Sequence, residues 1–162
     1  MNGGDLRIGH GVDAHRFTAD RPLMLGGVAV PHEQGLEGHS DGDPVAHALA
    51  DAVLGAAGLG DLGRHFPGDE RWRGAAGTAI LRHAAELARE AGWVVASAQV
   101  VAVAQRPRLA PHIDAMSQAL AGALGVEVDR VAVSATSTDG MGFTGRGEGI
   151  AASAVVLLAP IS

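Results

Sequence analysis

The chain has 162 residues, a formal net charge of −6 and no cysteine, and 47% of its residues are hydrophobic. This size and composition indicate one globular domain and exclude a disordered chain, and the acidic charge argues against a nucleic-acid-binding protein. Lysine and tyrosine are absent as well. Schiff-base lysines, cysteine nucleophiles and tyrosine acids are therefore excluded, which leaves histidine, carboxylate, hydroxyl, arginine, backbone and metal for any chemistry.

The N-terminal residues lack the basic and apolar regions of a signal peptide, and no apolar run reaches the length of a membrane span. The absence of cysteine fits a reducing compartment, so we expect a cytoplasmic protein. The acidic charge and the lack of a long apolar run lead us to expect no nucleic-acid or membrane partner. Aromatic residues make up only 3% of the chain, whereas glycine occurs 24 times. Such a core buries little area per side chain, so we expect an oligomer that adds buried surface.

The first elements predicted along the chain are strands at residues 6–10 and 23–30, with a polar loop at residues 13–15 between them. A loop at residues 32–43 then leads to a helix, because Asp43 is a favourable N-cap and Pro44 a favourable first helical residue. The helix has an apolar stripe, and we expect His47 and Asp51, four residues apart, on a different face.

The second half of the chain alternates between strands and helices. A polar, glycine-rich loop at residues 58–73 precedes a helix at residues 77–91 and a buried strand at 93–104. A third helix runs from Pro111 to Gly125, and strands follow at residues 130–138 and 150–158. Helices that pack on one face of a sheet of four or more strands predict an α+β sandwich formed by a single domain.

A carboxylate and two imidazoles form a candidate metal site. Asp13 and His15 lie on one side of an extended segment, and a chain reversal would bring His47 to them. Three protein ligands with an open fourth position are typical of catalytic zinc, whereas structural zinc is enclosed by four. His10 is a further candidate ligand or support. The alternative, that these are unrelated polar residues, is weakened by the crowding of histidine and aspartate at residues 39–47.

Three further segments have functional interpretations beside simpler ones. Residues 134–140 offer hydroxyl and amide donors for phosphate and an aspartate for Mg²⁺, although a strand end and a turn explain them as well. Residues 104–111 form a proline-stiffened loop that can present its backbone to a base, or simply connect a strand to a helix. In residues 145–149, Arg146 and Glu148 can pair if the segment is extended, and the glycines permit close backbone approach.

Together these segments resemble the 2-C-methyl-D-erythritol 2,4-cyclodiphosphate synthase family over almost the whole chain. Residues 7–15, 39–47, 60–67 and 142–149 match motifs of that family in order. The resemblance implies a homotrimer with active sites between neighbouring subunits. It also implies a lyase of non-mevalonate isoprenoid biosynthesis. The enzyme would convert 4-diphosphocytidyl-2-C-methyl-D-erythritol 2-phosphate to the cyclic diphosphate and CMP, the substrate's 2-phosphate attacking its β-phosphate.

The resemblance also implies roles for single residues. Asp13, His15 and His47 would bind Zn²⁺ or another divalent transition metal, and Asp139 would bind Mg²⁺ or Mn²⁺. His39 and Ser137 would be catalytic, and Arg146 and Glu148 would line the trimer axis, where an isoprenoid diphosphate can bind. The implied substrate-binding residues are Asp13, Ala14, His15, His39, Ser40, Asp61, Leu62, Gly63, Phe66, Asp69, Ala104, Gln105, Arg106, Pro107, Arg108, Leu109, Ala110, Thr136, Ser137, Thr138, Asp139, Phe143 and Arg146.

The chain departs from the family pattern in the loop after Phe66-Pro67, which is shorter, so that Asp69 takes the place of a usual aspartate. Asp139-Gly140 stands where Glu-Lys is usual, and Arg108 replaces a lysine. Two other functions remain open. A different zinc-dependent phosphodiesterase or hydrolase would use water as the nucleophile, and a trimeric binding protein for metal or isoprenoid diphosphate would show no turnover.

Overall fold

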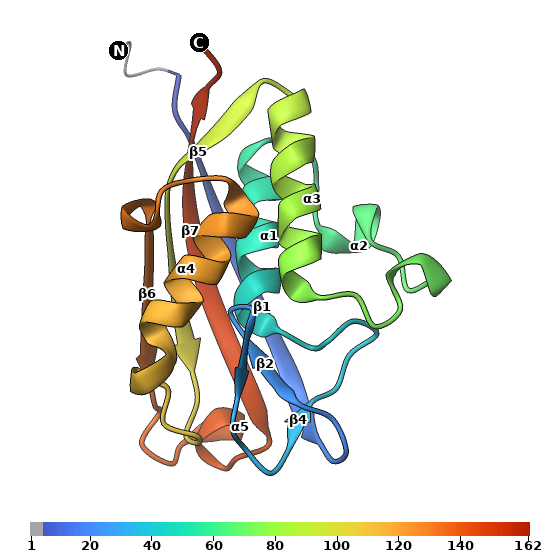
Figure 1. Ribbon diagram of the computed structural model, residues 1–162, viewed down its shortest axis with the longest axis vertical. Coiled ribbons are helices and arrows are strands. Elements are labelled where there is room, and N and C mark those ends of the chain that lie inside the picture. The colour runs from blue at the N-terminus through green and yellow to red at the C-terminus, as the bar shows by residue number, and fades with distance from the viewer. Residues whose placement is uncertain (1–4) are drawn as a thin grey trace.

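The computed structural model describes residues 5–162, in which a five-stranded sheet is covered by helices on one face (Figure 1). The strand order is β4-β1-β7-β5-β6, and only β5 and β6 pair in parallel. The predicted α+β architecture is confirmed. The strands are β1 (Arg7–Thr18), β4 (Gly35–Leu36), β5 (Trp93–Val103), β6 (Val131–Thr136) and β7 (Gly149–Pro160).

Three long helices cover the sheet: α1 (Pro44–Ala56), α3 (Gly77–Glu90) and α4 (Ile113–Leu124). Helix α1 packs on β1 and β7, and α3 packs against α1. The predicted start of α1 is confirmed, with Asp43 as N-cap and Pro44 in the first turn. His47 is buried like most of this central helix, and Asp51, which interacts electrostatically with both His47 and Asp13, is half-buried.

Strand β7 runs through the middle of the sheet and alternates between its two faces. Every second residue from Ile150 to Leu158 is buried against the helices, and the residues between them are half-buried or exposed. The strand predicted at residues 93–104 is likewise buried on one face only, because nothing in the chain covers the opposite face of β5 among the described residues. The sheet therefore presents one face to the core and leaves the other open.

The first strand is longer than predicted. Residues 13–15 belong to β1 and not to a polar loop, because Asp13 pairs with Ala152 and His15 with Ile150 on β7. The single strand predicted at residues 23–30 is instead a hairpin of β2 (Leu23–Leu25) and β3 (Val28–Val30). Its turn is Gly26-Gly27, whose φ angles of +58° and +77° suit a two-residue hairpin loop.

Short elements interrupt the predicted loops. Strand β4 lies within residues 32–43, and α2 (Leu62–His65) and the 3₁₀ turn η1 (Glu70–Trp72) lie within residues 58–73. The remaining short elements are η2 (Ala110–His112), η3 (Val128–Arg130) and α5 (Gly142–Gly145).

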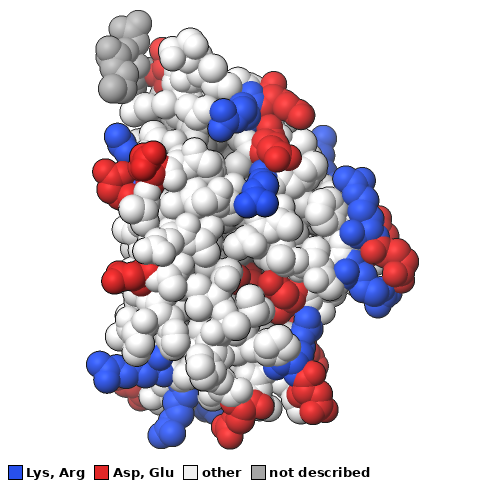
Figure 2. Space-filling view, in the orientation of Figure 1, with Lys and Arg blue, Asp and Glu red and all other residues white. Residues whose placement is uncertain are grey.

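Within residues 5–162, no helix has the length and apolar character needed to cross a membrane. Charged side chains of both signs lie mainly around the margins of the face shown in Figure 2, and much of its centre is uncharged.

Candidate active site

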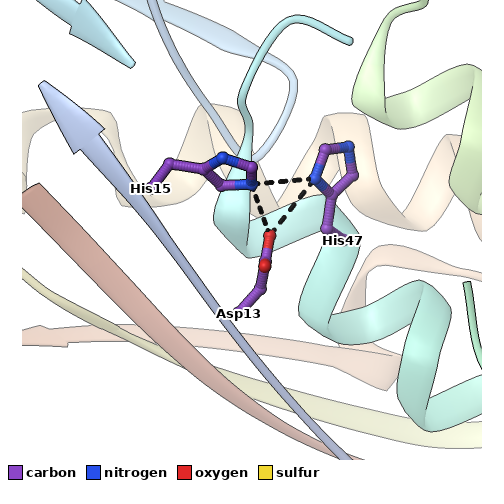
Figure 3. Close-up of side chains that lie close together, drawn as sticks. All are labelled: Asp13, His15 and His47. Atoms are coloured by element: carbon purple, nitrogen blue, oxygen red, sulfur yellow. Dashed lines mark hydrogen bonds and ion pairs between the residues drawn. The ribbon is translucent and has the colours of Figure 1, made fainter. Parts of the chain in front are cut away.

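Asp13, His15 and His47 converge beside the N-terminal end of α1 (Figure 3). The extended backbone of β1 turns Asp13 and His15 to the same side, and α1 brings His47 to them. The His15 Nε2 atom lies 2.7 Å from Asp13 Oδ2. The His47 Nδ1 atom lies 3.2 Å from the same oxygen and 3.4 Å from His15 Nε2. The predicted convergence of these residues is therefore confirmed.

The donor set fits a divalent metal ion. Two ligand atoms about 2.1 Å from a tetrahedral zinc ion lie about 3.4 Å apart. The separations of 3.2 and 3.4 Å from His47 Nδ1 agree with this spacing, and the shorter Asp13–His15 distance of 2.7 Å is that of a hydrogen bond. One carboxylate and two imidazoles leave further coordination positions to a ligand or substrate, which is the arrangement of a catalytic site.

The electrostatics of the cluster favour an ionised carboxylate. Burial raises the pKa of Asp13, but its hydrogen bonds to His15 and His47 and their positive charge outweigh burial and lower the pKa to about 2. Burial lowers the pKa of His15, but the hydrogen bond and charge of Asp13 outweigh it and raise the pKa. The Asp13 carboxylate is thus available as a metal ligand throughout the neutral range.

The ring of His47 is oriented by Ser40, a residue predicted to bind substrate. The Ser40 hydroxyl lies 3.1 Å from His47 Nε2, so the other ring nitrogen, Nδ1, faces Asp13 and His15. Partners of this kind set the ring position and tautomer of a metal-binding histidine. The sequence contained the signal, because Ser40 and His47 belong to the same polar run, but their contact depends on the fold of that run.

Asp43 anchors this run at the start of α1. Its Oδ1 atom accepts hydrogen bonds from the backbone N–H groups of Val45 and Ala46, both at 3.1 Å. The same carboxylate accepts hydrogen bonds from Gly26 at 2.9 Å and Gly27 at 2.8 Å. Burial raises the pKa of Asp43, and the backbone N–H donors oppose that rise. The carboxylate therefore joins the β2–β3 turn to the helix that carries His47.

Arg21 supports the same run from outside. Its guanidinium donates to the carbonyl groups of Gly38 at 3.1 Å and Ser40 at 2.6 Å, on both sides of His39. The His39 ring is exposed and its Nε2 atom contacts the carbonyl oxygen of Asp69. Neither Arg21 nor Asp43 was predicted as a site residue. The sequence predicts Asp43 as an N-cap, but its contacts with the β2–β3 turn and those of Arg21 with Gly38 and Ser40 depend on the tertiary fold.

A cavity of about 230 Å³ opens at the metal-binding cluster. Seven of the predicted site residues line it: Asp13, His15, His39, Ser40, His47, Leu62 and Phe66. Gly68, Trp72 and Ile80 also line it and were not predicted. Trp72 packs against Phe66, with ring centroids 4.6 Å apart. Its Nε1 atom is the one buried side-chain nitrogen or oxygen without a hydrogen-bond partner within residues 5–162.

A second, larger cavity of about 820 Å³ lies at the ends of β5 and β6. All seven residues of the predicted base-binding segment line it, as do Thr136 and Ser137. His32, Glu33, Ile113 and Ala135 form the rest of the wall and were not predicted. The side chain of Gln105 accepts a hydrogen bond from the Gly140 N–H at 3.0 Å. The base-binding segment is thereby tied to the turn that follows β6.

Several predicted residues lie outside these two cavities. The Asp139 carboxylate is exposed and accepts a hydrogen bond from the Ser137 hydroxyl at 3.3 Å. Thr138 donates to the Met141 carbonyl at 2.6 Å. Asp61 caps α2 and accepts from the Arg64 N–H at 3.1 Å. Other predicted residues outside both walls are Ala14, Gly63, Asp69, Phe143, Arg146 and Glu148.

Arg146 and Glu148 form the predicted ion pair, with Nε–Oε2 and Nη2–Oε2 distances of 3.0 and 2.8 Å. The segment is not extended as assumed, because α5 ends at Gly145 and Arg146 caps it.

Phe143 and Glu148 line a third cavity of about 200 Å³ together with Ala14, His15, Arg16 and Gly149. Asp51, which accepts from the Leu62 N–H at 2.8 Å, has a pKa raised by burial.

The helix-covered sheet and the open carboxylate–imidazole cluster beside a cavity define an α+β protein with a candidate catalytic metal centre. The YgbB family model matches residues 6–159, and the chain belongs to this family. It is 53% identical to the 2-C-methyl-D-erythritol 2,4-cyclodiphosphate synthase of Trichlorobacter lovleyi, covering 96% of this chain and 99% of that protein.

Other relatives agree with this assignment. The synthase of the same name from Pseudomonas aeruginosa is 54% identical, covering 94% of this chain and 98% of that protein. A solved structure of 2C-methyl-D-erythritol-2,4-cyclodiphosphate synthase in a CDP-bound form is 40% identical, with a TM-score of 0.85. That match covers 94% of this chain and 99% of the solved one. The family resemblance seen in the sequence is confirmed.

Proposed function

We propose that this chain converts 4-diphosphocytidyl-2-C-methyl-D-erythritol 2-phosphate to 2-C-methyl-D-erythritol 2,4-cyclodiphosphate and CMP, as a phosphorus–oxygen lyase of non-mevalonate isoprenoid biosynthesis. The observation that carries the proposal is the open cluster of Asp13, His15 and His47. It lies at the wall of a cavity in a chain 53% identical to a synthase of that name. The CDP-bound form of a related synthase supports a cytidine-linked ligand.

The reaction needs no protein nucleophile. An oxygen of the substrate's 2-phosphate forms a bond to the β-phosphorus, and the bond from that phosphorus to the oxygen shared with the α-phosphorus breaks. That oxygen and the bonding electrons leave with CMP. Because the attacking and leaving groups belong to one molecule, the protein contributes mainly alignment and charge neutralisation. A chain without lysine, cysteine and tyrosine retains every group that such catalysis requires.

Asp13, His15 and His47 would hold Zn²⁺ or another divalent transition metal, which when bound supplies Lewis-acid polarisation of a phosphate oxygen. Asp139 would bind Mg²⁺ or Mn²⁺. His39, at the wall of the metal cavity, and Ser137, at the wall of the larger one, would orient the phosphates. The backbone of residues 104–110 would read the cytosine, and residues 61–63 would meet the ribose.

We further propose that the working form is a homotrimer whose active sites lie between subunits. In one chain the metal cavity and the base cavity share no lining residue, so a neighbouring copy can bring them together. The open face of the sheet carries exposed apolar side chains, including Ile8 at 74% and Val12 at 60% exposure. Apolar surface of this kind favours association with further copies. Arg146 and Glu148 would then lie at the axis, with an isoprenoid diphosphate as an additional ligand.

Substituting Ile8→Asp is expected to dissociate the trimer, because a carboxylate would be buried without a partner in the interface. Sedimentation velocity should show a monomer that has lost CMP release and still binds zinc. Val128→Asp is the matched control, since Val128 is also an exposed apolar residue, at 49%, but lies outside the sheet in η3. A trimeric Ile8→Asp protein would contradict the proposed interface.

The reaction itself is tested by incubating purified protein with the substrate, Zn²⁺ and Mg²⁺ in ¹⁸O-labelled water. We expect CMP and an unlabelled cyclic diphosphate, because the attacking oxygen comes from the substrate. A linear product that contains ¹⁸O would identify a hydrolase instead. Retention of the ligand without CMP release would identify a binding protein, and either result would refute the proposed reaction.

A further inference from the structure

Strand β1 and helix α1 are in direct backbone contact at two glycines. A Cβ atom built on Gly11 would lie 2.1 Å from the carbonyl oxygen of Ala48 and 2.8 Å from the backbone nitrogen of Ala52. A Cβ atom on Gly9 would lie 2.0 Å from the Ala52 carbonyl oxygen. Ordinary van der Waals contact needs about 3.5 Å, so no side chain fits at either position unless the helix moves. Both glycines are part of the N-terminal sequence motif at residues 7–15.

We propose that Gly11 is a positioning residue for the metal centre, because its missing side chain sets the distance between the two elements that supply the ligands. The inference rests on the proposed metal-binding function. Gly11 lies two residues before Asp13 on β1, and its contact on α1, Ala48, directly follows His47. This contact between the strand and the helix is therefore adjacent to the ligand cluster on both elements.

The metal centre is sensitive to this distance. A methyl group at residue 11 would meet backbone atoms, which cannot move away by a change of rotamer, so the helix turn that carries His47 must shift outward. The overlap exceeds 1 Å when the 2.1 Å separation is compared with an ordinary contact of about 3.5 Å. Metal–ligand distances tolerate about 0.2 Å. His47 would thus be withdrawn from Asp13 and His15, which at present lie 3.2 and 3.4 Å from its Nδ1 atom.

Gly9 provides a matched comparison on the same strand. Its added Cβ would overlap the helix as severely, at 2.0 Å, but it would meet Ala52 and Ala56 and not Ala48. That contact lies toward the end of α1, which extends to Ala56, whereas His47 is in the first turn. Gly9→Ala should therefore disturb the packing of the helix and leave the ligand geometry largely in place.

The test compares zinc binding and stability in Gly11→Ala, Gly9→Ala and the unaltered protein. Isothermal calorimetry on folded protein measures zinc affinity, and urea unfolding without metal measures stability. We expect both variants to lose stability to a similar degree. Zinc affinity should fall about 10- to 100-fold in Gly11→Ala, the range seen when a residue that orients a metal ligand is lost, and remain within about threefold of the original in Gly9→Ala. If Gly11→Ala folds poorly, both variants are compared in sucrose, which favours the compact state.

Three outcomes would overturn the role of Gly11 while leaving the proposed enzyme intact: unaltered zinc affinity in Gly11→Ala, an equal loss in both variants, or a Gly11→Ala protein that does not fold in sucrose when Gly9→Ala does. Each of these outcomes would show that Gly11 contributes to helix packing and does not position the metal ligands. Failure of the unaltered protein to bind zinc would instead refute the proposed metal centre, and the role of Gly11 with it.

Discussion

Replacing His47 with alanine is expected to abolish zinc binding and CMP release while the protein keeps its fold and its oligomeric state. His47 supplies one of three converging ligand atoms, and its Nδ1 lies 3.2 Å from Asp13 Oδ2. Loss of a residue that merely orients a metal ligand costs about 10- to 100-fold in metal affinity, so loss of the ligand itself should cost more. Calorimetry with zinc and a CMP-release assay measure the two effects.

The matched control for this experiment is His112→Ala, which removes an imidazole from η2, outside the walls of all three cavities. It should bind zinc and release CMP like the unaltered protein. Circular dichroism and sedimentation would establish that His47→Ala remains folded and assembled. Stoichiometric zinc in a folded His47→Ala protein would show that the ligand set is wrong, whatever its activity.

Replacing Asp43 with alanine is expected to lower the free energy of unfolding by about 3–5 kcal/mol, because several buried backbone N–H donors lose their acceptor at about 1–3 kcal/mol each. Asp43 is fully buried, and its carboxylate accepts hydrogen bonds from four backbone N–H groups. Alanine would leave these donors unsatisfied and disconnect the β2–β3 turn from α1. Urea unfolding monitored by circular dichroism measures the change.

Two variants show whether this effect arises from the buried network. Asp43→Asn keeps one carbonyl oxygen but turns an amide toward a backbone N–H group, so it should lose an intermediate amount of stability. Asp61→Ala removes an exposed N-cap with one hydrogen bond, from Arg64, and should cost about 1 kcal/mol. If Asp43→Ala is no more destabilising than Asp61→Ala, the carboxylate is not the anchor that its contacts indicate.

Several interactions attach α1 to its surroundings near His47. Asp43 holds the start of the helix to the hairpin turn, Gly11 permits its contact with β1, and Ser40 orients the ring of His47. These three interactions act on a stretch of only a few residues around the ligand. The geometry of the candidate metal site therefore depends on packing and backbone hydrogen bonds as well as on the ligand residues.

The sequence by itself determined the features that follow from local rules. The start of α1 was predictable because N-capping by Asp43 and the favourable place of Pro44 act within one helical turn. The convergence of Asp13 and His15 was predictable because alternate residues share a side of any extended segment. The ordered motifs identified the family, since several matches at the expected separations are specific together.

Only the tertiary structure decided how these pieces meet. Strand β1 continues through Asp13 and His15 because they pair with β7, nearly the whole chain away in sequence. His47 is buried because α1 lies between the sheet and α3. The metal and base cavities are separate because β1, which carries Asp13 and His15, lies on one side of β7. The base-cavity wall includes the end of β6 and the segment that follows β5, which lie on the other side. Register and packing distance depend on partners distant in sequence, whereas capping and periodicity involve only near neighbours.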